Sequence, residues 1–425
     1  MFNYSNIVED RVFEMMSKSN DEFIPVIITG NDCEYSSLEG CIKDLGGIVK
    51  HRLHIINAVA VHLPSNNIRS LSQREQISRV HLDDIVMKMM DKASTTVASH
   101  YANSHGLTGK DIGVAVIDTG VHPHADLTSP KNRIVKFLDL VNKKSSPYDD
   151  DGHGTHVAGI IAGNGFSSRG KYTGIAPDAK IIAIKSLDEN GGGNVSDVIA
   201  GIQWAIENKD PYNIKVITLS LGIKTKASYR DDPLCQAVTQ AKNKNITVVV
   251  AAGNSGPNPS TISSPAISPH AISVGACDDR KASNPQDCSI ANFSSRGPTV
   301  DKISKPDVLA PGVGIQSLSN EDGYTSLTGT SMAAPIVAGC IALLYEENPN
   351  LTYQEIQRKI SQGSIDLGEE ANSQGAGLLD FKKIFDIPPP SQKDHDDKKQ
   401  DGKGLSPSQG NWLIVIIILL LILLI

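Results

Sequence analysis

Residues 112–120 read Ile-Gly-Val-Ala-Val-Ile-Asp-Thr-Gly, an almost continuous apolar run that ends in a carboxylate. Similar short and mostly apolar runs follow at residues 181–184, 215–219, 246–251 and 271–274. Helical patterns lie between or after them, at residues 195–207, 232–242 and 331–346. Strands that are apolar on both faces belong to parallel sheets covered by helices. The sequence therefore predicts an α/β domain over residues 93–385 with a doubly wound, mostly parallel sheet, and ligands are expected beyond the carboxyl ends of its strands.

The composition is that of a folded globular protein. The chain has 425 residues, of which 40% are hydrophobic and 20% charged. Its net charge of −7 argues against nucleic acid as the main partner. The six cysteines form no Cys-x-x-Cys pair, which favours reduced thiols, with a disulfide between Cys277 and Cys288 as the less favoured alternative. The first twenty residues hold no basic stretch followed by an apolar core, so no secretory signal peptide is expected.

Residues 1–92 form a separate small pattern. Strand-like segments occur at residues 23–29, 48–53, 58–63 and 80–87, and helical patterns at residues 36–45 and 65–76. Strand-helix-strand-strand-helix-strand is the ferredoxin-like order, so we expect a small α+β domain. It holds no recognisable active site, which favours a structural or regulatory role.

The chain changes character again near its C-terminal end. Residues 386–411 are polar and predict a flexible linker, whereas residues 412–425 are uninterruptedly apolar. A helix of that length reaches roughly 21 Å, short of the roughly 30 Å hydrocarbon core of a bilayer. Because the run has no polar face, a membrane anchor with local thinning of the bilayer is favoured over a buried helix. Lysines between residues 393 and 403 would keep the rest of the protein cytoplasmic.

A carboxylate and a histidine stand out in the large domain. Asp118 ends the first strand, where an aspartate alone can be a mere turn former. His153 lies between two glycines in Asp-Gly-His-Gly-Thr-His-Val-Ala-Gly, residues 151–159, at the start of a helical pattern. His153 and His156 have the spacing of a zinc pair, but no HExxH glutamate accompanies them. We therefore expect His156 to be a packed support.

Ser331 lies in Thr-Gly-Thr-Ser-Met-Ala-Ala-Pro, residues 328–335, directly before an apolar helical run. A hydroxyl at a helix start gains from unpaired backbone N–H groups and from the helix dipole, although a simple cap has the same pattern. A nucleophilic serine also needs a base, and the base needs a carboxylate that orients it. Asp118 and His153 supply these two groups. Together the three residues predict an acid, a base and a nucleophile.

Asn254 provides the remaining part of such a site. It follows an apolar strand in Ala-Ala-Gly-Asn-Ser-Gly, residues 251–256. Its side-chain N–H, with the backbone N–H of Ser331, could bind the oxyanion of a tetrahedral intermediate. A turn residue is the alternative at that position.

These motifs resemble the signature motifs of the subtilases, the subtilisin-like serine endopeptidases. The matching stretches are Asp-Thr-Gly at 118–120, His-Gly-Thr-His-Val-Ala-Gly at 153–159, Ala-Ala-Gly-Asn at 251–254 and Gly-Thr-Ser-Met-Ala-Ala-Pro at 329–335. The resemblance covers roughly residues 95–385 and is closest to bacterial subtilases made without a signal peptide. It implies Asp118 as orienting acid, His153 as general base and Ser331 as nucleophile of a triad that needs no cofactor, with Asn254 as the oxyanion donor.

The resemblance also implies a substrate cleft that binds proteins or peptides. Ser220, Leu221 and Gly222 would pair with the substrate backbone and wall the primary specificity pocket. Ala251, Ala252 and Gly253 would form the opposing wall, and residues 263–266 the floor. Small, uncharged walls favour a medium or large apolar residue before the scissile bond.

Two further expectations come from the family. Asp126 matches an acidic calcium ligand, although residues 163–172 do not match the calcium loop of secreted subtilisins. The N-terminal unit resembles an inhibitory propeptide whose end, residues 87–93, lies through the cleft and is cut there. A permanent non-inhibitory domain is the alternative. At the level of the whole protein, the alternatives are a catalytically inactive subtilase fold that serves as a binding or regulatory protein at the membrane, and a secreted protease.

Overall fold

The large domain is built around a central sheet of ten strands in the computed structural model. The structure describes residues 7–18, 23–31, 35–71, 74–88, 91–92, 106–280, 282 and 284–386. Nine strands of the sheet lie in the order β19-β20-β16-β14-β13-β11-β7-β9-β8, and β15 pairs with β14. Their bounds are β7 (Gly113–Asp118), β8 (Ile134–Asp139), β9 (Lys180–Lys185), β11 (Ile214–Leu219), β13 (Thr247–Ala251), β14 (Ile272–Asp278), β15 (Ser289–Ile290), β16 (Val308–Pro311), β19 (Ser364–Ile365) and β20 (Leu378–Leu379).

All neighbouring strands from β8 to β20 pair in parallel, and only β19 and β15 add antiparallel edges to this sheet of the described chain. The strand order departs in both directions from β7, so the sheet is doubly wound. The predicted fold class is confirmed. The carboxyl ends of β7, β11 and β13 therefore open on the same edge, where ligands bind in such sheets.

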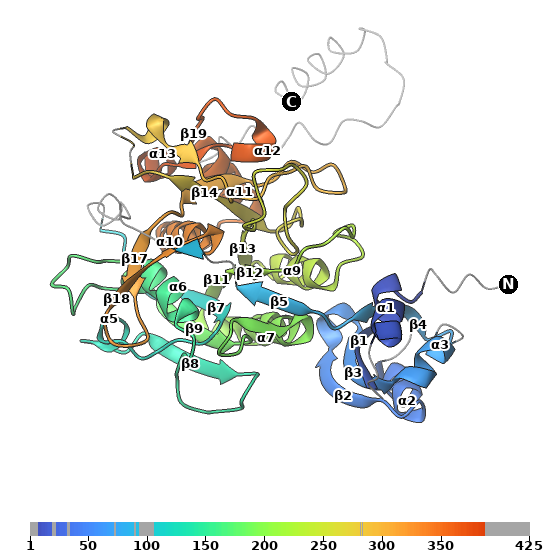
Figure 1. The fold of residues 1–425 in the computed structure, drawn as a ribbon. Helices are drawn as coiled ribbons and strands as arrows, with labels where there is room; N and C mark the ends of the chain where they lie inside the picture. Colours follow the sequence, from blue (N-terminus) through green and yellow to red (C-terminus); the bar gives the residue numbers. More distant parts are fainter. Residues whose placement is uncertain are drawn as a thin grey trace, which may run out of the picture. The chain divides into compact units, whose positions relative to one another are not determined.

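Helices cover both faces of this sheet (Figure 1). The longest are α6 (His153–Ala162), α7 (Val195–Glu207), α9 (Pro233–Asn243), α10 (Thr330–Glu347) and α11 (Tyr353–Gln362). Strand β7 shows why two layers form, because its side chains alternate between the faces. Val114 and Val116 pack with α6 and α10, whereas Ala115 and Ile117 pack with α7 and α9. Short helices complete the domain: α5 (Ala125–Thr128), α8 (Lys209–Tyr212), α12 (Ala371–Gln374) and α13 (Phe381–Asp386).

The N-terminal unit is a four-stranded antiparallel sheet in the order β2-β3-β1-β4. This is the strand order of a ferredoxin-like unit. Its elements are α1 (Asp10–Lys18), β1 (Phe23–Gly30), α2 (Tyr35–Asp44), β2 (Ile48–Leu53), β3 (Ala58–Pro64), α3 (Ile68–Leu71) and β4 (Ile77–Leu82). The helix expected over residues 65–76 is shorter, because Ser65–Asn67 form a 3-10 turn and the backbone turns again at Arg74 before β4. Serine and asparagine compete with helical hydrogen bonds through their own side chains.

The single strand expected at residues 80–87 is two strands. Between β4 and β5 (Ile85–Lys88) lie Asp83 and Asp84, which bind the N-terminus of α7. The N–H of Ser196 donates to Asp83 Oδ1 at 2.8 Å, and the N–H of Val195 donates to the carbonyl of Asp84 at 2.9 Å. These contacts redirect the chain, so that β5 leaves the first sheet.

Strand β5 enters a small sheet of the large domain. It lies between β10 (Gly192–Asn194) and β12 (Leu221–Gly222) and is antiparallel to both. Figure 1 draws β5 next to β12. Another three-stranded sheet follows, formed by β17 (Ile315–Leu318), β18 (Tyr324–Thr328) and β6 (Asp91–Lys92). The N-terminal unit is thus joined to the large domain by strand pairing as well as by side-chain contacts.

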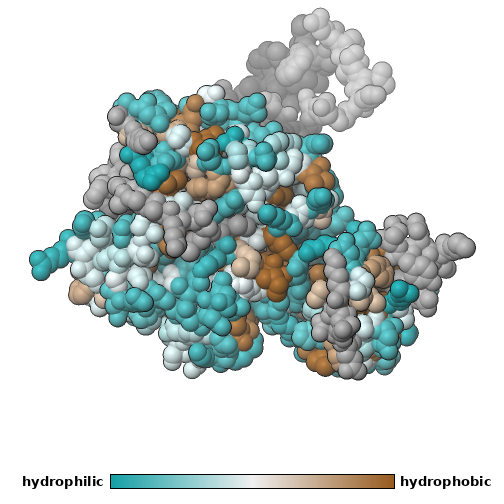
Figure 2. All heavy atoms as spheres, in the orientation of Figure 1, coloured by the Kyte–Doolittle hydropathy of each residue, from teal (hydrophilic) through white to brown (hydrophobic). Residues whose placement is uncertain are grey.

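The face drawn in Figure 2 is largely hydrophilic, with small hydrophobic patches. The apolar side chains of the sheets and covering helices lie in the interior instead. Within the part of the chain that the structure describes, no helix has both the length and the apolar character needed to cross a bilayer. The apolar run at residues 412–425 and nearly all of the expected linker lie outside the described residues.

Candidate active site

Asp118 and His153 are in direct contact at the carboxyl end of β7. The Nδ1 atom of His153 lies 2.7 Å from Oδ1 of Asp118, and both side chains are buried. The hydroxyl of Thr119 accepts from the N–H of Gly154 at 2.8 Å and so fixes the start of α6 against this turn. Only glycine fits at position 154, since a Cβ there would come within 2.1 Å of the carbonyl oxygen of Gly120. The close approach of helix and turn brings the imidazole onto the carboxylate.

Ser331 is the second residue of α10 and is also buried. Its hydroxyl donates to the carbonyl of Ser220 at 2.9 Å, and the hydroxyl of Ser220 donates to the carbonyl of Ser331 at 3.0 Å. The Nε2 atom of His153 is buried and has no hydrogen-bond partner among the described residues. The serine hydroxyl therefore bonds to Ser220, and it makes no hydrogen bond to His153 in this structure.

The side-chain amide of Asn254 has a fixed orientation. Its Oδ1 accepts from the N–H of Thr330 at 3.1 Å and from the hydroxyl of Thr330 at 2.9 Å. Because a backbone N–H can only donate, the carbonyl end of the amide must face Thr330. The Nδ2 group is buried and has no hydrogen-bond partner within the described part of the chain. Such a donor costs about 1–3 kcal/mol when left unpaired, and it is available to an acceptor that enters the site.

The segments expected to wall the substrate cleft are linked to one another. Residues 251–253 follow the end of β13, and the carbonyl of Ala252 accepts from the N–H of Ser263 at 3.1 Å. The N–H of Ser264 donates to the carbonyl of Ile223, directly after β12, at 2.9 Å. Residues 263–264 therefore connect the two walls, as a floor would. Both Ala252 and Ser264 are fully buried.

The chain that follows the N-terminal unit pairs with two segments next to the expected cleft. In the register of β5 with β12, Lys88 lies opposite Leu221. In the register of β6 with β18, Asp91 lies opposite Thr328, three residues before Ser331. Residues 89, 90 and 93, which complete the expected passage of residues 87–93, lie outside the described residues. Strand β5 thus pairs with one expected wall of the cleft, and β6 pairs with the strand that leads into Ser331.

Comparison with known proteins assigns this chain to a family. A family model described as "Subtilase family" matches residues 109–379. The chain belongs to the subtilase family. This subtilase is 41% identical over 362 residues to serine protease AprX of Bacillus subtilis (strain 168), which covers 79% of this chain and 81% of AprX. It is 34% identical over 347 residues to subtilisin E of the same organism, covering 80% of this chain and 84% of subtilisin E.

A solved structure shows the same fold. Fervidolysin from Fervidobacterium pennivorans, described as a keratinolytic enzyme related to subtilisin, matches with a TM-score of 0.69 and 25% sequence identity. The match covers 87% of this chain, which spans 62% of the fervidolysin chain. The family and the curated relatives together show that this subtilase is a subtilisin-like serine endopeptidase.

His156 lies one helical turn after His153 in this subtilase and has its own partners. Its Nε2 atom lies 3.0 Å from the carbonyl of Ile315 and 3.2 Å from that of Thr325. Burial, together with the neighbouring His153, lowers the pKa of His156 to about 3. His156 is therefore neutral and ties α6 to β17 and β18. Within the described residues no group of three metal-ligating side chains occurs, at this pair or elsewhere.

Asp126 does not fit the expected calcium ligand. Its Oδ1 accepts from the N–H of Ser167 at 2.7 Å, and its Oδ2 accepts from the hydroxyl of Tyr324 at 2.7 Å. Burial raises the pKa of Tyr324 to about 12, so the phenol stays a donor at neutral pH. The guanidinium of Arg133 binds the carbonyl oxygens of residues 126, 162 and 177. Calcium needs six to eight free oxygens, and donors already occupy those present here.

Two residues with clear contacts in the site were not singled out from the sequence: Thr119 fixes the start of α6, and Thr330 orients Asn254. Asp151 belongs to an acidic run at residues 149–151 that the sequence marks as a solvated loop or as a group that attracts a basic substrate, and it binds Lys88 of β5. Thr119 and Thr330 lie inside the quoted motifs, so their positions next to Asp118 and Ser331 were the available signal. The pairing of Asp151 with Lys88 has no such signal, because 63 residues separate them.

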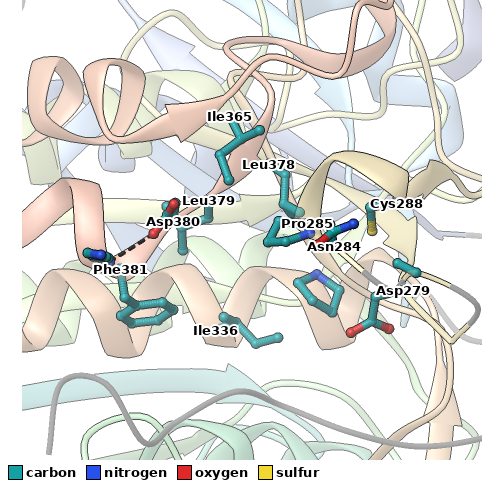
Figure 3. A pocket seen from close by; sticks show the side chains of 13 residues that line it. Asp279, Asn284, Pro285, Cys288, Ile336, Ile365, Leu378, Leu379, Asp380 and Phe381 are labelled. Carbon is teal, nitrogen blue, oxygen red and sulfur yellow. Dashed lines mark hydrogen bonds between the residues drawn. The ribbon is translucent and has the colours of Figure 1, made fainter. Parts of the chain in front are cut away.

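An apolar cavity lies away from these residues. It has a volume of about 410 Å³ and is lined by residues such as Ile336, Ile365, Leu378 and Cys288, as Figure 3 shows. None of the candidate site residues lines it. The Sγ atom of Cys288 lies 2.9 Å from that of Cys277, and both are free thiols, so the disulfide alternative is not formed.

Proposed function

We propose that this serine endopeptidase cleaves peptide bonds through an acyl-enzyme on Ser331, with His153 as general base and Asp118 as the orienting acid. The observation that carries the proposal is the buried 2.7 Å contact between His153 and Asp118. The unpaired amide of Asn254 supports it, because a buried donor without a partner suits an oxyanion.

Each group has one task in the proposed reaction. The hydroxyl of Ser331 turns from Ser220 to His153, loses its proton to Nε2 and attacks the carbonyl carbon. The oxyanion accepts from Nδ2 of Asn254 and from the N–H of Ser331. His153 then gives the proton to the leaving amine, and Asp118 stabilises the imidazolium in between. Water, activated by His153, hydrolyses the acyl-enzyme by the same steps.

We also propose a preference for a medium or large apolar residue before the scissile bond. Supporting it, the walls at residues 220–222 and 251–253 and the floor at residues 263–266 carry no charged side chain. A charged residue in such a pocket would lose its hydration without gaining a partner. Hydrolysis of a peptide library should yield products that end in such residues, and an absolute requirement for arginine or lysine there would contradict this preference.

The N-terminal unit is proposed to be an inhibitory propeptide, with β5 and β6 in the cleft in the place of substrate. Asp83 holds α7 as described, and Asp197 of α7 accepts from Lys50 at 3.0 Å and lies 2.6 Å from His51. Strand β5 ends at Lys88, opposite Leu221, and β6 begins at Asp91, opposite Thr328. Because one strand pairs with the expected cleft wall and the other pairs just before Ser331, we propose that the cut falls between them, at the bond between residues 89 and 90.

Comparison of wild type with Ser331→Ala tests both proposals at once. Wild type should convert to a chain that begins at residue 90, whereas Ser331→Ala should stay whole. Equal masses for both proteins would contradict processing by Ser331 and favour a permanent N-terminal domain. Wild type that neither shortens nor labels with a fluorophosphonate would favour the inactive binding protein.

From the sequence of residues 412–425 we propose attachment to a membrane, with the catalytic domain on the cytoplasmic side. The test is fractionation of cells that express the full chain or a chain ending at residue 411. The full chain should sediment with membranes and the shortened chain should not. Equal distribution of the two would contradict the proposal.

A further inference from the structure

The three consecutive acids at residues 149–151 have three different tasks. Asp149 caps α6, because its Oδ2 accepts from the N–H and the hydroxyl of Thr155 at 2.9 and 2.6 Å. Asp150 pairs with the buried ammonium of Lys185 at 2.5 Å. Asp151 alone of the three faces the cleft. The cluster is therefore not a uniform acidic surface.

The partner of Asp151 is Lys88, in the strand that occupies the cleft. The Nζ atom of Lys88 binds Oδ2 of Asp151, and the two side chains are 19% and 7% exposed. The other oxygen, Oδ1, accepts from the N–H of His153 at 3.1 Å, so the carboxylate is held in place by the start of α6. A fixed and largely buried carboxylate thus lies at the far end of the space that the lysine side chain fills.

Gly191 forms the wall along the stem of that lysine. A Cβ at Gly191 would come within 2.4 Å of Cδ of Lys88, and the residue has a φ of +75°. The carbonyl of Gly191 accepts from the N–H of Lys88 at 3.0 Å, which holds the backbone in register. A glycine at the side and a carboxylate at the end make a slot for a long side chain with a positive tip.

We propose that Asp151 is a specificity-determining residue that selects lysine or arginine at the position filled by Lys88, two residues before the scissile bond. This inference rests on the proposed function and on the assigned cut between residues 89 and 90. When the propeptide leaves, the carboxylate loses its ammonium partner but stays in the wall of the cleft. A substrate with a basic side chain restores the pair, whereas an apolar one leaves a largely buried charge uncompensated.

The test compares quenched fluorescent peptides that differ only at that position, which is lysine, norleucine or glutamate. Norleucine has the stem of lysine without its charge. With self-processed wild type, we expect kcat/KM to be about 10- to 100-fold higher for lysine than for norleucine, the range for a hydrogen bond to a charged group. Glutamate should be the slowest. This comparison needs no variant. Equal kcat/KM values for the lysine and norleucine peptides would already contradict the inference.

Variants then assign the preference to one residue. In Asp151→Asn, which keeps the Oδ1 acceptor for His153, the lysine-to-norleucine ratio should fall to near 1. The matched control is Asp150→Asn, with the same change one residue away and facing Lys185, which should keep the wild-type ratio. A preference that survives in Asp151→Asn would overturn the inference. Wild type that cleaves no peptide would contradict the proposed function itself, whereas equal cleavage of all three contradicts only this inference.

Discussion

The amide oxygen of Asn254 accepts two hydrogen bonds from Thr330, so its Nδ2 group is directed away from Thr330 and is buried without a partner among the described residues. Thr330 immediately precedes Ser331 in α10. The residue that orients the proposed oxyanion donor is thus next to the proposed nucleophile. Any movement of the helix start shifts both groups together.

Replacement of the amide should slow the chemical step. In Asn254→Ala, we expect kcat to fall by about 10²- to 10³-fold with little change in KM, because the donor acts on the charge of the transition state. Steady-state kinetics on one apolar peptide measures this. The control is Asn258→Ala, an exposed asparagine four residues later. An unchanged kcat in Asn254→Ala would remove this residue from the oxyanion site.

The carboxylate of Asp118 should matter through the imidazole. Asp118→Asn keeps the size of the side chain but favours the wrong tautomer of His153, so kcat should fall on the order of 10⁴-fold. Single-turnover kinetics would show whether the loss lies in acylation. The exposed Asp178→Asn serves as a control for the loss of one negative charge. A loss of less than tenfold in Asp118→Asn would mean that His153 does not depend on this carboxylate.

Burial of neutral His156 predicts a specific pH dependence of stability. Its folded-state pKa of about 3 lies below the ordinary value of 6.5, so below pH 6.5 the unfolded chain binds a proton that the folded chain does not. The free energy of unfolding should therefore fall by about 1.4 kcal/mol per pH unit from this residue as the pH drops from 6.5 toward 3. Above pH 6.5 the full contribution is present.

Urea unfolding of Ser331→Ala at pH 7 and pH 5 measures this effect without autolysis. Adding His156→Gln, which can still donate to Ile315, should shrink the difference between the two pH values by about 2 kcal/mol. An equal difference with and without His156→Gln would show that another group causes the pH dependence.

Chelation at the Asp126 site should have no effect, because protein donors take the place of a cation. Treatment with EDTA should remove no stabilisation at this site. Tyr324→Phe should instead destabilise the protein by about 1–3 kcal/mol, because it leaves a buried carboxylate oxygen of Asp126 unpaired. The comparison is thermal unfolding of both proteins with and without EDTA. A loss of stability in EDTA that Tyr324→Phe abolishes would restore the calcium expectation.

Local patterns predicted the parts of this protein that depend on short stretches of chain. The apolar run that ends in Asp118 predicted a central parallel strand, and motif spacing predicted the carboxylate of Asp118 and the imidazole of His153, which are in contact at the end of that strand. Contacts between distant residues were not predictable in this way. The exit of β5 at Asp83, the partners of Asp126 and the pairing of Asp151 with Lys88 each depend on the folded positions of two segments.

The most direct test of the account is labelling of the self-processed protein with a fluorophosphonate, followed by mass mapping of the modified peptide. The reagent traps a serine that a neighbouring base has activated. We predict modification of Ser331 alone, and none in Ser331→Ala or His153→Ala. Labelling that persists in Ser331→Ala, or that maps to a different serine, would contradict the central claim that Ser331 is the nucleophile.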